Sequence, residues 1–595
     1  MQTAQFTWLR RVILTITILT GMVLSIKAVT EPDLWWQLRT GEWMLENKKV
    51  TTHDVFSYTY ENVPWVNVKW GYEILQAVVA KYLGGAAMLP LLQVVITVFL
   101  LLLLLRTTGI FGRQLTNDNY KPAIGTALVI MLGLVVMEFR MTGRPEAVSH
   151  LLSAAFALLF ISYRFTATKW IFLLIPLQAL WANLHEAFGL GVIISVIFAA
   201  GTWFEFLFLK NSKFYTFSHE AKPQILTLAV AFSIIAISIN PNGFDLLFHP
   251  LEIFSQLNRN KFTVELFSFT KKEYWTYQAY LALGMLVLTF LVLRDILQAQ
   301  EGKQQPGFIF NAINKIGTGY LLFIAAMLYL TSSALRNVPF LITAILPLLA
   351  VGIDQKINQK LTATGKIKAA YFTVLAVACF FYLSVINNWY YSRFNTSSYF
   401  GFEVNAAQTP HGAASFIKKH HIKGKSFTDF LSSSYLLWYL QPGYKTYIDL
   451  RDLDIFPEIF FRNNFMLYQA PGNVFPVADE DMQFDYVVLL NDDIFRNVHQ
   501  YMLTDKNFDL VYADMLASVY LRKTAGHSRI IRQFGYNNGE KDVFNEILPV
   551  SASSTGKVVT KIFNPFYKPR NYAEYNTLRY KSAYYTYLGV DIPRL

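Results

Sequence analysis

Long apolar runs recur through the first 390 residues, and each is about long enough to cross a membrane as a helix. The whole chain is 53% hydrophobic and only 15% charged, whereas soluble proteins carry roughly 25% charged residues. These features predict a polytopic α-helical membrane protein with about eleven transmembrane helices. The apolar runs occupy residues 10–28, 86–105, 122–138, 146–163, 169–184, 187–209, 224–240, 276–293, 316–334, 337–353 and 368–386.

Composition also excludes several classes of function. Cys379 is the only cysteine, so the chain has no intrachain disulfide and no cysteine-based zinc site. The net charge of +12 is better explained by basic loops at cytoplasmic headgroups than by nucleic acid, because no nucleic-acid motif is present. Arg10 and Arg11 precede the first apolar run, as they would in a cleaved signal peptide. Residues 26–29 make a poor cleavage site, and we therefore favour a retained anchor.

The distribution of Lys and Arg between the runs predicts the orientation of the chain. The loops at residues 106–121, 210–222, 294–315 and 356–368 are basic and are expected in the cytoplasm, together with the N-terminus. An odd number of spans then places everything after about residue 388 outside the cytoplasm. Five polar motifs fall on the same outer side, and we expect them to form a single site. They lie at residues 31–36, 140–146, 183–186, 240–243 and 332–337.

Three parts are predicted along the chain. Residues 1–390 form a transmembrane module whose first outer loop covers residues 30–70. Residues 400–525 change to a mixed composition with turn signals and predict an extracytoplasmic α/β domain. Residues 526–595 form a basic tail rich in tyrosine.

Local patterns predict some of the elements in the outer parts. Asp33 is placed to cap a helix over residues 34–46, which we expect to lie in the membrane interface with its tryptophans as anchors. A second amphipathic segment covers residues 65–82. The α/β domain is expected to contain a helix at 412–420 and strands at 446–449, 486–490 and 516–521.

An acid in the first outer loop, many spans and a C-terminal outer domain together resemble the GT-C membrane glycosyltransferases. Four motifs are similar to signatures of a largely uncharacterised bacterial group of such proteins, and this resemblance covers most of residues 1–525. The chain departs from the group's pattern at Gln37, where His is usual, and at Glu186 and Leu450, where Gly is usual. The four motifs are Asp33-Leu-Trp-Trp-Gln-Leu-Arg-Thr-Gly41, Trp181-Ala-Asn-Leu-His185, Asn240-Pro-Asn-Gly243 and Tyr447-Ile-Asp449-Leu-Arg451.

The resemblance implies roles for the acid of the first outer loop and for three arginines. GT-C enzymes use sugars carried on polyprenyl phosphate or pyrophosphate lipids. Asp33 matches the catalytic acid, which takes a proton from the acceptor hydroxyl or holds a metal ion that does so; Glu31 is a weaker candidate. The alternative role of Asp33 is the helix N-cap. Arg140, Arg144 and Arg336 would bind the lipid phosphate, or, alternatively, anchor the spans at the headgroups.

A divalent cation is the one cofactor that the sequence suggests. His185 and Glu186 lie at a tight outer turn and could bind Mg or Mn together with Asp33, although a hydrogen-bonded turn is the favoured interpretation. The other predicted cavity residues are Trp35, Trp36, Asn183, Asn240 and Asn242; the two tryptophans are favoured as interfacial anchors and could stack on a sugar.

Two further pairs of polar residues have a structural interpretation. His53 and Asp54 are expected to form a turn. Asp449 and Arg451 are expected to pair with each other within the α/β domain.

Taken together, these features predict an integral membrane glycosyltransferase. It would move a sugar from a polyprenyl-phosphate carrier to an extracytoplasmic glycan, lipid or protein, in the inner membrane of a bacterium, without nucleic acid as a partner. Alternatives are a non-catalytic lipid-carrier transporter or assembly subunit, and a ligase that moves a whole lipid-linked oligosaccharide. The transporter is disfavoured because charges gather at the outer ends of the spans and no repeat is visible.

Overall fold

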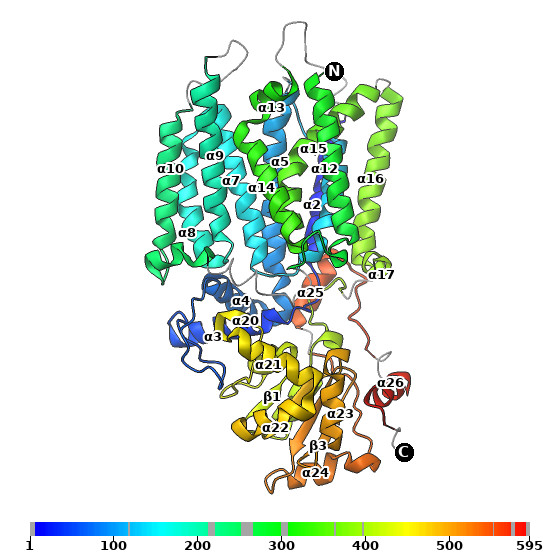
Figure 1. Cartoon of the computed structure of the whole chain (residues 1–595). Coiled ribbons are helices and arrows are strands. Elements are labelled where there is room, and N and C mark those ends of the chain that lie inside the picture. Colours follow the sequence, from blue (N-terminus) through cyan, green and yellow to red (C-terminus); the bar gives the residue numbers. More distant parts are fainter. Residues whose placement is uncertain are drawn as a thin grey trace. The chain divides into compact units, whose positions relative to one another are not determined.

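The computed structural model describes residues 6–116, 119–211, 221–251, 266–298, 307–361, 364–394, 398–550, 553–572 and 578–590. By their contacts these residues form two compact units. Unit 1 comprises Met1–Lys27 and Pro90–Phe400, and unit 2 comprises Ala28–Leu89 and Gly401–Leu595. Figure 1 labels many of the elements of both units. This division into two units reflects contacts between residues and not function. The predicted domain boundaries at residues 390, 400 and 525 therefore stay a prediction.

Unit 1 is a bundle of helices, so the predicted α-helical membrane protein is confirmed. Among the described residues, seven helices are long and apolar enough to cross a membrane, or up to nine if each of two bent helix pairs is one span. The helices are α2 (Thr7–Ser25), α5 (Pro90–Thr116), α6 (Ile124–Met137), α7 (Glu146–Thr166), α8 (Leu174–Leu184), α9 (Phe188–Phe204), α10 (Pro223–Ile235), α12 (Tyr277–Gln298), α13 (Phe308–Ile316), α14 (Thr318–Ser333), α15 (Val338–Lys360), α16 (Thr364–Ile386) and α17 (Trp389–Arg393).

The predicted number of eleven spans is not confirmed, although every predicted apolar run coincides with helix. Helix α6 has 14 residues, which makes it about 21 Å long and shorter than the hydrocarbon core. The segment Lys169–Leu184 is also too short to count as a span. Bends of 119° and 96° interrupt the two helix pairs that begin at Pro223 and Phe308. Apolar composition alone does not reveal where a run is shortened or bent.

Helix α15 forms the centre of unit 1 and carries a buried acid that caps a neighbouring helix. Helix α6 has no capping side chain of its own, since its N-cap residue is Ala123. The Asp354 carboxylate instead accepts hydrogen bonds from the backbone N–H groups of Ala123 at 3.0 Å and Thr126 at 3.1 Å. It also accepts from the hydroxyls of Tyr120 and Thr126. The Asp354 carboxylate thereby satisfies orphan amides at the start of α6.

We expect Gly125→Ala to lower the thermal stability of unit 1. A Cβ atom at residue 125 would lie 2.6 Å from Asp354 Oδ1 and 2.7 Å from the Asp354 backbone nitrogen, so α6 would have to move away from its cap. Gly109→Ala in α5 is the matched control, because a Cβ atom there meets nothing within 4 Å and alanine favours a helix by about 1 kcal/mol. Thermal unfolding of the purified protein should show a lower melting temperature for Gly125→Ala only; equal melting temperatures would contradict the capping role.

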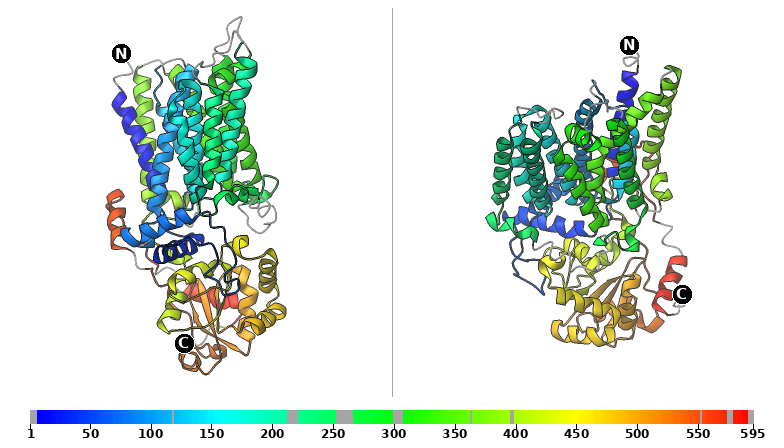
Figure 2. Two further views of the ribbon diagram at one scale, coloured as in Figure 1. Left: turned by 90° about the vertical axis from the view of Figure 1, so that its left-hand side faces the viewer. Right: turned by 45° about the horizontal axis from the view of Figure 1, so that its top comes forward.

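Unit 2 combines the first outer loop with the C-terminal part of the chain. Its four-stranded sheet has the order β1-β2-β4-β3, with β1 parallel to β2 and the other pairs antiparallel. Helix α3, dark blue in Figure 2, packs on α4 and α19. The elements are α3 (Asp33–Asn47), α4 (Trp70–Leu83), α18 (His411–Lys419), β1 (Ser426–Thr428), α19 (Phe430–Tyr439), α20 (Asp452–Ile455), α21 (Glu458–Gln469), α22 (Pro471–Met482), β2 (Tyr486–Leu490), α23 (Arg496–Thr504), β3 (Phe508–Ala513), β4 (Ala517–Arg522), α24 (Ser528–Phe534), α25 (Ser554–Phe563) and α26 (Leu578–Leu588).

The predicted α/β character of the C-terminal part is confirmed, with one strand misplaced. The predicted strands at 486–490 and 516–521 correspond to β2 and β4, and the predicted helix at 412–420 corresponds to α18. The predicted strand at 446–449 is wrong: only Thr446 pairs, in an isolated bridge to Ser57. The Asp449 side chain accepts hydrogen bonds from Thr446 and from the Arg451 backbone, and these local bonds favour a turn over a strand.

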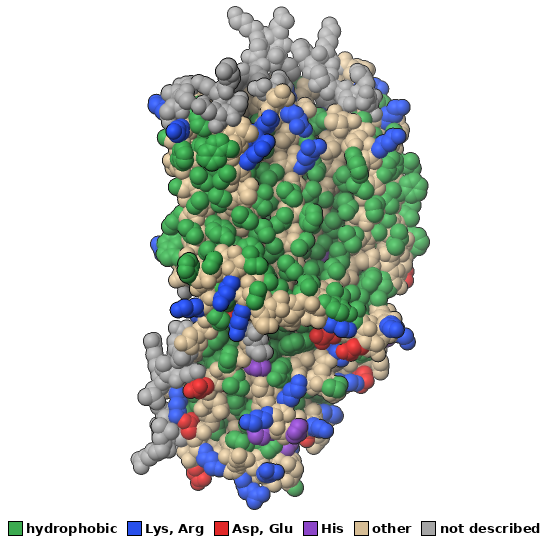
Figure 3. Space-filling model, turned by 180° about the vertical axis from the view of Figure 1, so that it is seen from behind, with side chains coloured by type: hydrophobic (Ala, Val, Ile, Leu, Met, Phe, Trp, Pro, Cys, Tyr) green, Lys and Arg blue, Asp and Glu red, His purple; other side chains and the backbone are tan. Residues whose placement is uncertain are grey.

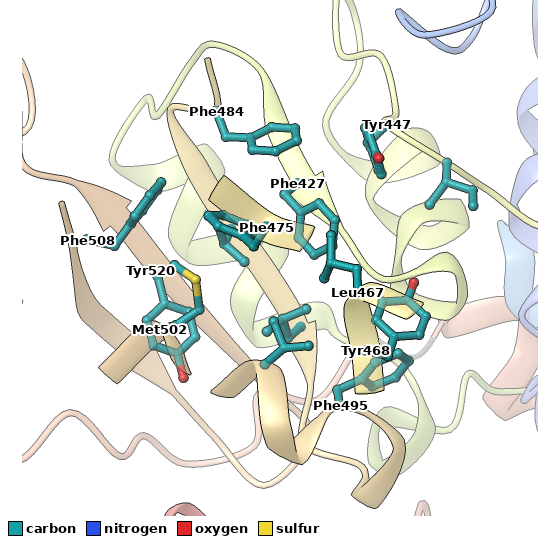
Figure 4. Packing of buried hydrophobic residues seen from close by; sticks show 14 of the residues in the cluster. Phe427, Tyr447, Leu467, Tyr468, Phe475, Phe484, Phe495, Met502, Phe508 and Tyr520 are labelled. Carbon is teal, nitrogen blue, oxygen red and sulfur yellow. The ribbon is translucent and has the colours of Figure 1, made fainter. Parts of the chain in front are cut away.

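An aromatic core holds unit 2 together (Figure 4). Phe427 of β1 lies against Phe475 of α22 and against Phe484, with ring centroids 5.5 Å and 5.4 Å apart. Trp36 and Trp65 of the first loop belong to the same buried cluster. So do Phe56 of that loop and Tyr584, Tyr585 and Leu588 of the C-terminal tail. Segments from both ends of the chain therefore share one core.

A fully buried arginine joins the first loop to the C-terminal part. Arg451 lies between Asp54 and Asp449, and the three side chains are 0% exposed. The guanidinium donates to Asp449 at 2.9 Å and 2.7 Å and to Asp54 through its remaining arm. The rings of Phe56 and Trp65 lie 5.3 Å and 5.2 Å from the guanidinium carbon. The predicted pairing of Asp449 with Arg451 is present, and Asp54 is its third member.

Candidate functional site

A buried ion pair marks the polar end of the unit 1 bundle. Arg140 ends the 3₁₀ turn Glu138–Arg140, and Glu146 begins α7. Their side chains are 8% and 12% exposed and form an ion pair. Gly143, with φ of +77°, turns the chain between them, and its N–H donates to Gln93 of α5. The turn therefore holds the Arg140 side chain buried in unit 1, paired with Glu146.

Two histidines extend this polar cluster along α7 and α8. His150, one turn after Glu146, has Nε2 at 3.7 Å from a Glu146 carboxylate oxygen. The neighbouring Ser149 hydroxyl lies 2.8 Å from His185 Nδ1 and accepts a hydrogen bond from the Trp181 indole at 2.7 Å. His185 follows the last residue of α8, and its carbonyl accepts from the Phe188 N–H in the turn to α9. The predicted hydrogen-bonded turn at His185 is present.

The other two predicted arginines, Arg336 and Arg144, also lie in short turns of unit 1. Arg336, in the short turn between α14 and α15, is half-buried, and its positive charge acts on the Glu146 carboxylate. Arg144 is half-buried in the turn before α7, where its carbonyl accepts from the Ala147 N–H. Glu186 is half-buried beside His185. The structure thus brings Arg140, Arg336 and His150 together around Glu146, and His185 lies close to His150.

A small cavity of about 20 Å³ lies beside this cluster, inside the bundle. Its polar lining includes Arg140, His150 and Gln93. The rest is largely aliphatic and comes from α5, α6, α7 and α15, including Leu100, Leu101, Leu104, Ile130, Leu134 and Leu346. Aliphatic side chains thus adjoin a buried cation here, around a space about large enough for one water molecule.

Sequence analysis missed a second buried ion pair in unit 1. Lys27, just after α2, is 5% exposed, and Glu138 is 2% exposed. The Lys27 ammonium contacts the Glu138 carboxylate and donates to the Glu138 carbonyl at 2.6 Å. Charged residues at the ends of apolar runs were the available signal, because such residues are costly unless they have a function or a partner.

The side chains of Asn183 and Asn240 are hydrogen-bonded to backbone groups, and Asn242 takes part through its backbone N–H. Asn183 donates to the carbonyls of Ala179 at 2.7 Å and Ile239 at 2.8 Å. Asn240 donates to the Gly243 carbonyl at 3.0 Å, and its side-chain oxygen accepts from the Asn242 N–H at 2.6 Å. These bonds shape a turn after α10 and tie it to α8. A role for these residues in substrate binding stays a prediction.

Asp33 is the first residue of α3 and not its N-cap, so the predicted capping role is wrong. Pro32 occupies the N-cap position. The first helical amides bond instead to the carbonyls of Glu31 and Pro32, each at 3.3 Å. Asp33 is half-buried and accepts a long hydrogen bond of 3.4 Å from the Trp36 indole. Its carboxylate at the helix N-terminus is favoured by the helix dipole.

Trp35 and Trp36 are core residues of unit 2. Both are 2% exposed, so they do not serve as interfacial anchors. Trp35 packs edge-on against Tyr435 of α19, with ring centroids 4.7 Å apart, and Trp36 packs against Trp65. This packing fixes the direction of α3, and with it the position of Asp33 at its start. Stacking of these rings on a sugar stays a prediction.

The predicted cation site does not assemble within either unit. Among the described residues, no three His, Cys, Asp or Glu side chains gather closely enough to hold a metal ion. His185 and Glu186 belong to unit 1, and Asp33 belongs to unit 2. Among the described residues, the donors of each unit do not by themselves form a site ready for Mg or Mn.

Glu73 is a buried acid that sequence analysis did not identify. It lies on α4, facing α3, and is 0% exposed. One carboxylate oxygen accepts from the Asn67 amide at 2.7 Å, while Oε1 has no hydrogen-bond partner among the described residues. Burial raises the pKa of Glu73 to about 8, and Asn67 and Lys69 offset part of this increase. Glu73 is therefore largely protonated in the folded protein at neutral pH.

We expect Glu73 to make unit 2 less stable as the pH rises. Below pH 4.5, Glu73 is protonated whether folded or unfolded. Between pH 4.5 and about 8 only the unfolded chain ionises, so the free energy of unfolding falls by about 1.4 kcal/mol per pH unit. Above the pKa of Glu73 in the folded protein, the free energy of unfolding no longer falls on account of this group. Glu73→Gln should remove this dependence: thermal unfolding from pH 5 to pH 9 should show the melting temperature of the native protein falling relative to the variant. Parallel curves would contradict the raised pKa.

Comparison with known proteins supports the fold of the chain. No protein-family model and no curated protein matches it. Among solved structures, the chain is similar to the apo form of an oligosaccharyltransferase from Archaeoglobus fulgidus. Their TM-score is 0.55 and their identity 12%, over 86% of this chain and 74% of that one.

A second solved structure has the same fold. It is the archaeal oligosaccharyltransferase AglB from Archaeoglobus fulgidus, in complex with an inhibitory peptide and a dolichol-phosphate. The TM-score is 0.50 and the identity 12%, over 86% of this chain and 73% of that one. At such low identity the likeness concerns the fold alone, and the bacterial group suggested by the motifs stays a prediction. The chain has the GT-C fold of a polytopic membrane protein, the fold of these archaeal oligosaccharyltransferases.

Proposed function

We propose that the protein is a membrane glycosyltransferase that takes a glycosyl group from a polyprenyl-phosphate or polyprenyl-pyrophosphate lipid. The observation that carries this proposal is the pair of cations Arg140 and Arg336 at Glu146, which adjoins an aliphatic interior formed by α5, α6 and α15. A polyprenyl lipid has the same division into a hydrocarbon chain and an anionic head. The likeness in fold to oligosaccharyltransferases, one of them bound to a dolichol-phosphate, supports the same donor class.

The chemistry requires a base and a stabiliser of the leaving group. The acceptor hydroxyl loses its proton to the Asp33 carboxylate while its oxygen attacks the anomeric carbon of the donor. The bond between that carbon and the phosphate oxygen breaks, and the phosphate leaves with an additional negative charge. Arg336, Arg140 and Arg144 stabilise this charge through guanidinium hydrogen bonds. Glu31 supports Asp33, and a divalent cation held by Asp33 is the alternative form of the same role.

Transfer of a whole oligosaccharide is the second candidate function. The fold favours it, because both solved structures named above are oligosaccharyltransferases. The same cation cluster would serve a donor carrying one sugar or many. We further propose that the N-terminus is cytoplasmic, that unit 2 is extracytoplasmic and binds the glycan, lipid or protein acceptor, and that the membrane is the inner membrane of a bacterium.

We expect Asp33→Asn to lower transfer at least about a hundredfold, because general-base catalysis contributes roughly 10²–10⁴ to the rate. The assay is release of free lipid phosphate and mass spectrometry of the products, in the purified protein with lipid-linked donors. Glu46→Gln at the exposed end of the same helix is the control and should keep full activity. Unchanged transfer by folded Asp33→Asn would exclude Asp33 as base. Loss of activity in EDTA that Mg or Mn restores would instead assign Asp33 to a metal ion.

We expect Arg336→Gln to lower kcat/KM for the lipid donor at least about tenfold, since a charge-assisted hydrogen bond contributes roughly 1.5–3 kcal/mol. Arg336 is the most suitable arginine to test, because replacing Arg140 would also leave Glu146 without its ion-pair partner. The control is Arg294→Gln in α12, an exposed arginine paired with Asp295. Equal kcat/KM for both variants would place the donor phosphate elsewhere.

A further inference from the structure

Two segments of unit 2 concentrate positive charge. Residues 411–425 and 522–534 contain no Asp or Glu. Most of their basic side chains are exposed, and among the described residues these form no ion pair with an acid. The exposed side chains, which we call the basic face, are Lys418, Lys419, His421, Lys423, Lys425, Lys523, Arg529 and Arg532.

Contacts across the fold join the two segments into one surface. The His420 ring at the end of α18 packs on Phe534 at the end of α24, with centroids 4.7 Å apart. Lys425 directly precedes β1, and Lys523 directly follows β4. The Asp485 N–H donates to the Lys425 carbonyl at 2.8 Å, and the Arg522 N–H donates to the Asp485 carbonyl at 2.9 Å. Lys425 and Lys523 therefore lie at the same end of the sheet.

Nearby acids offset only part of this charge. The Asp485 carboxylate accepts from the Lys425 N–H at 2.8 Å, and Asp509 interacts electrostatically with Lys523. Seven Lys and Arg side chains of the basic face stand against these two carboxylates. Figure 3 shows Lys, Arg and His side chains intermixed on one side of this unit.

We propose that the basic face binds a polyanionic glycan, which carries carboxylate or phosphate groups along its length and serves as the acceptor. This inference rests on the proposed function and names its acceptor class. Lysines spaced along an exposed segment match the repeated negative charges of such a glycan. Electrostatic attraction, which is strongest at low ionic strength, would hold the glycan near unit 2. An anionic membrane is a poorer fit, because neither segment exposes a large hydrophobic side chain, and surface-bound proteins bury such residues among lipids.

The test is a binding measurement that needs no donor and no turnover. The full-length protein in neutral-lipid nanodiscs is titrated with polygalacturonate, with uncharged dextran, and with vesicles containing phosphatidylglycerol. We expect binding of polygalacturonate only, weakening as salt is added. The variant Lys419→Glu, Lys423→Glu, Arg529→Glu should bind polygalacturonate at least tenfold more weakly.

A matched variant controls for net charge. Lys557→Glu, Lys561→Glu, Arg462→Glu makes the same change in charge at exposed residues of unit 2 outside the basic face and should bind normally. Equal binding by both variants would overturn the proposal. Vesicle binding that the first variant alone loses would overturn it in favour of a membrane partner. Because Asp33-dependent transfer is assayed separately, glycan binding without transfer would refute the proposed function alone, and transfer without glycan binding would refute this inference alone.

Discussion

Unit 2 depends on the buried ion pairs that the Arg451 guanidinium forms with Asp449 and Asp54. The guanidinium joins Asp449, two residues earlier, to Asp54, which lies 397 residues away in the sequence. A charge removed from water is costly unless its partners and hydrogen bonds are complete, and removing one partner of a buried pair costs about 3–5 kcal/mol. Here two carboxylates and two aromatic rings surround the single cation. The first outer loop is therefore an integral part of the C-terminal fold.

The position of the proposed catalytic acid follows from this arrangement. Helix α3 packs so closely on α4 that a Cβ atom at Gly41 would lie 2.0 Å from the Glu73 carbonyl oxygen. Trp35 and Trp36 fix the other side of α3 against aromatic residues of unit 2. Asp33, at the start of this rigid helix, is held by packing that extends to β1. A reactive carboxylate is better positioned on such a helix than on a mobile loop.

The sequence was sufficient to predict most of the apolar helices and part of the α/β domain, but not β1, β3 or the contacts between distant segments. Apolar runs located most helices of the bundle, although not α13 or α17, and short strand-like runs located β2 and β4. The pairing of Asp449 with Arg451 was predictable because the two residues are neighbours, whereas Asp54 could not be assigned to them from a separation of 397 residues. The capping role of Asp33 failed because Pro32 takes the N-cap position and backbone carbonyls satisfy the first amides. Lys27 and Glu138 were missed because each looks like an ordinary charge at the end of an apolar run.

The division of unit 2 along the chain has a consequence for its biosynthesis. Residues 28–89 leave the ribosome after a single span, but their partners in the core follow only after residue 400. The first part of unit 2, which includes Asp54, Phe56 and Trp65, therefore has no Arg451 to contact until every helix of unit 1 has been synthesised. A fragment that begins at residue 401 would lack part of its own interior. Neither segment of unit 2 contains the whole domain, and its core can form only after both segments have been synthesised.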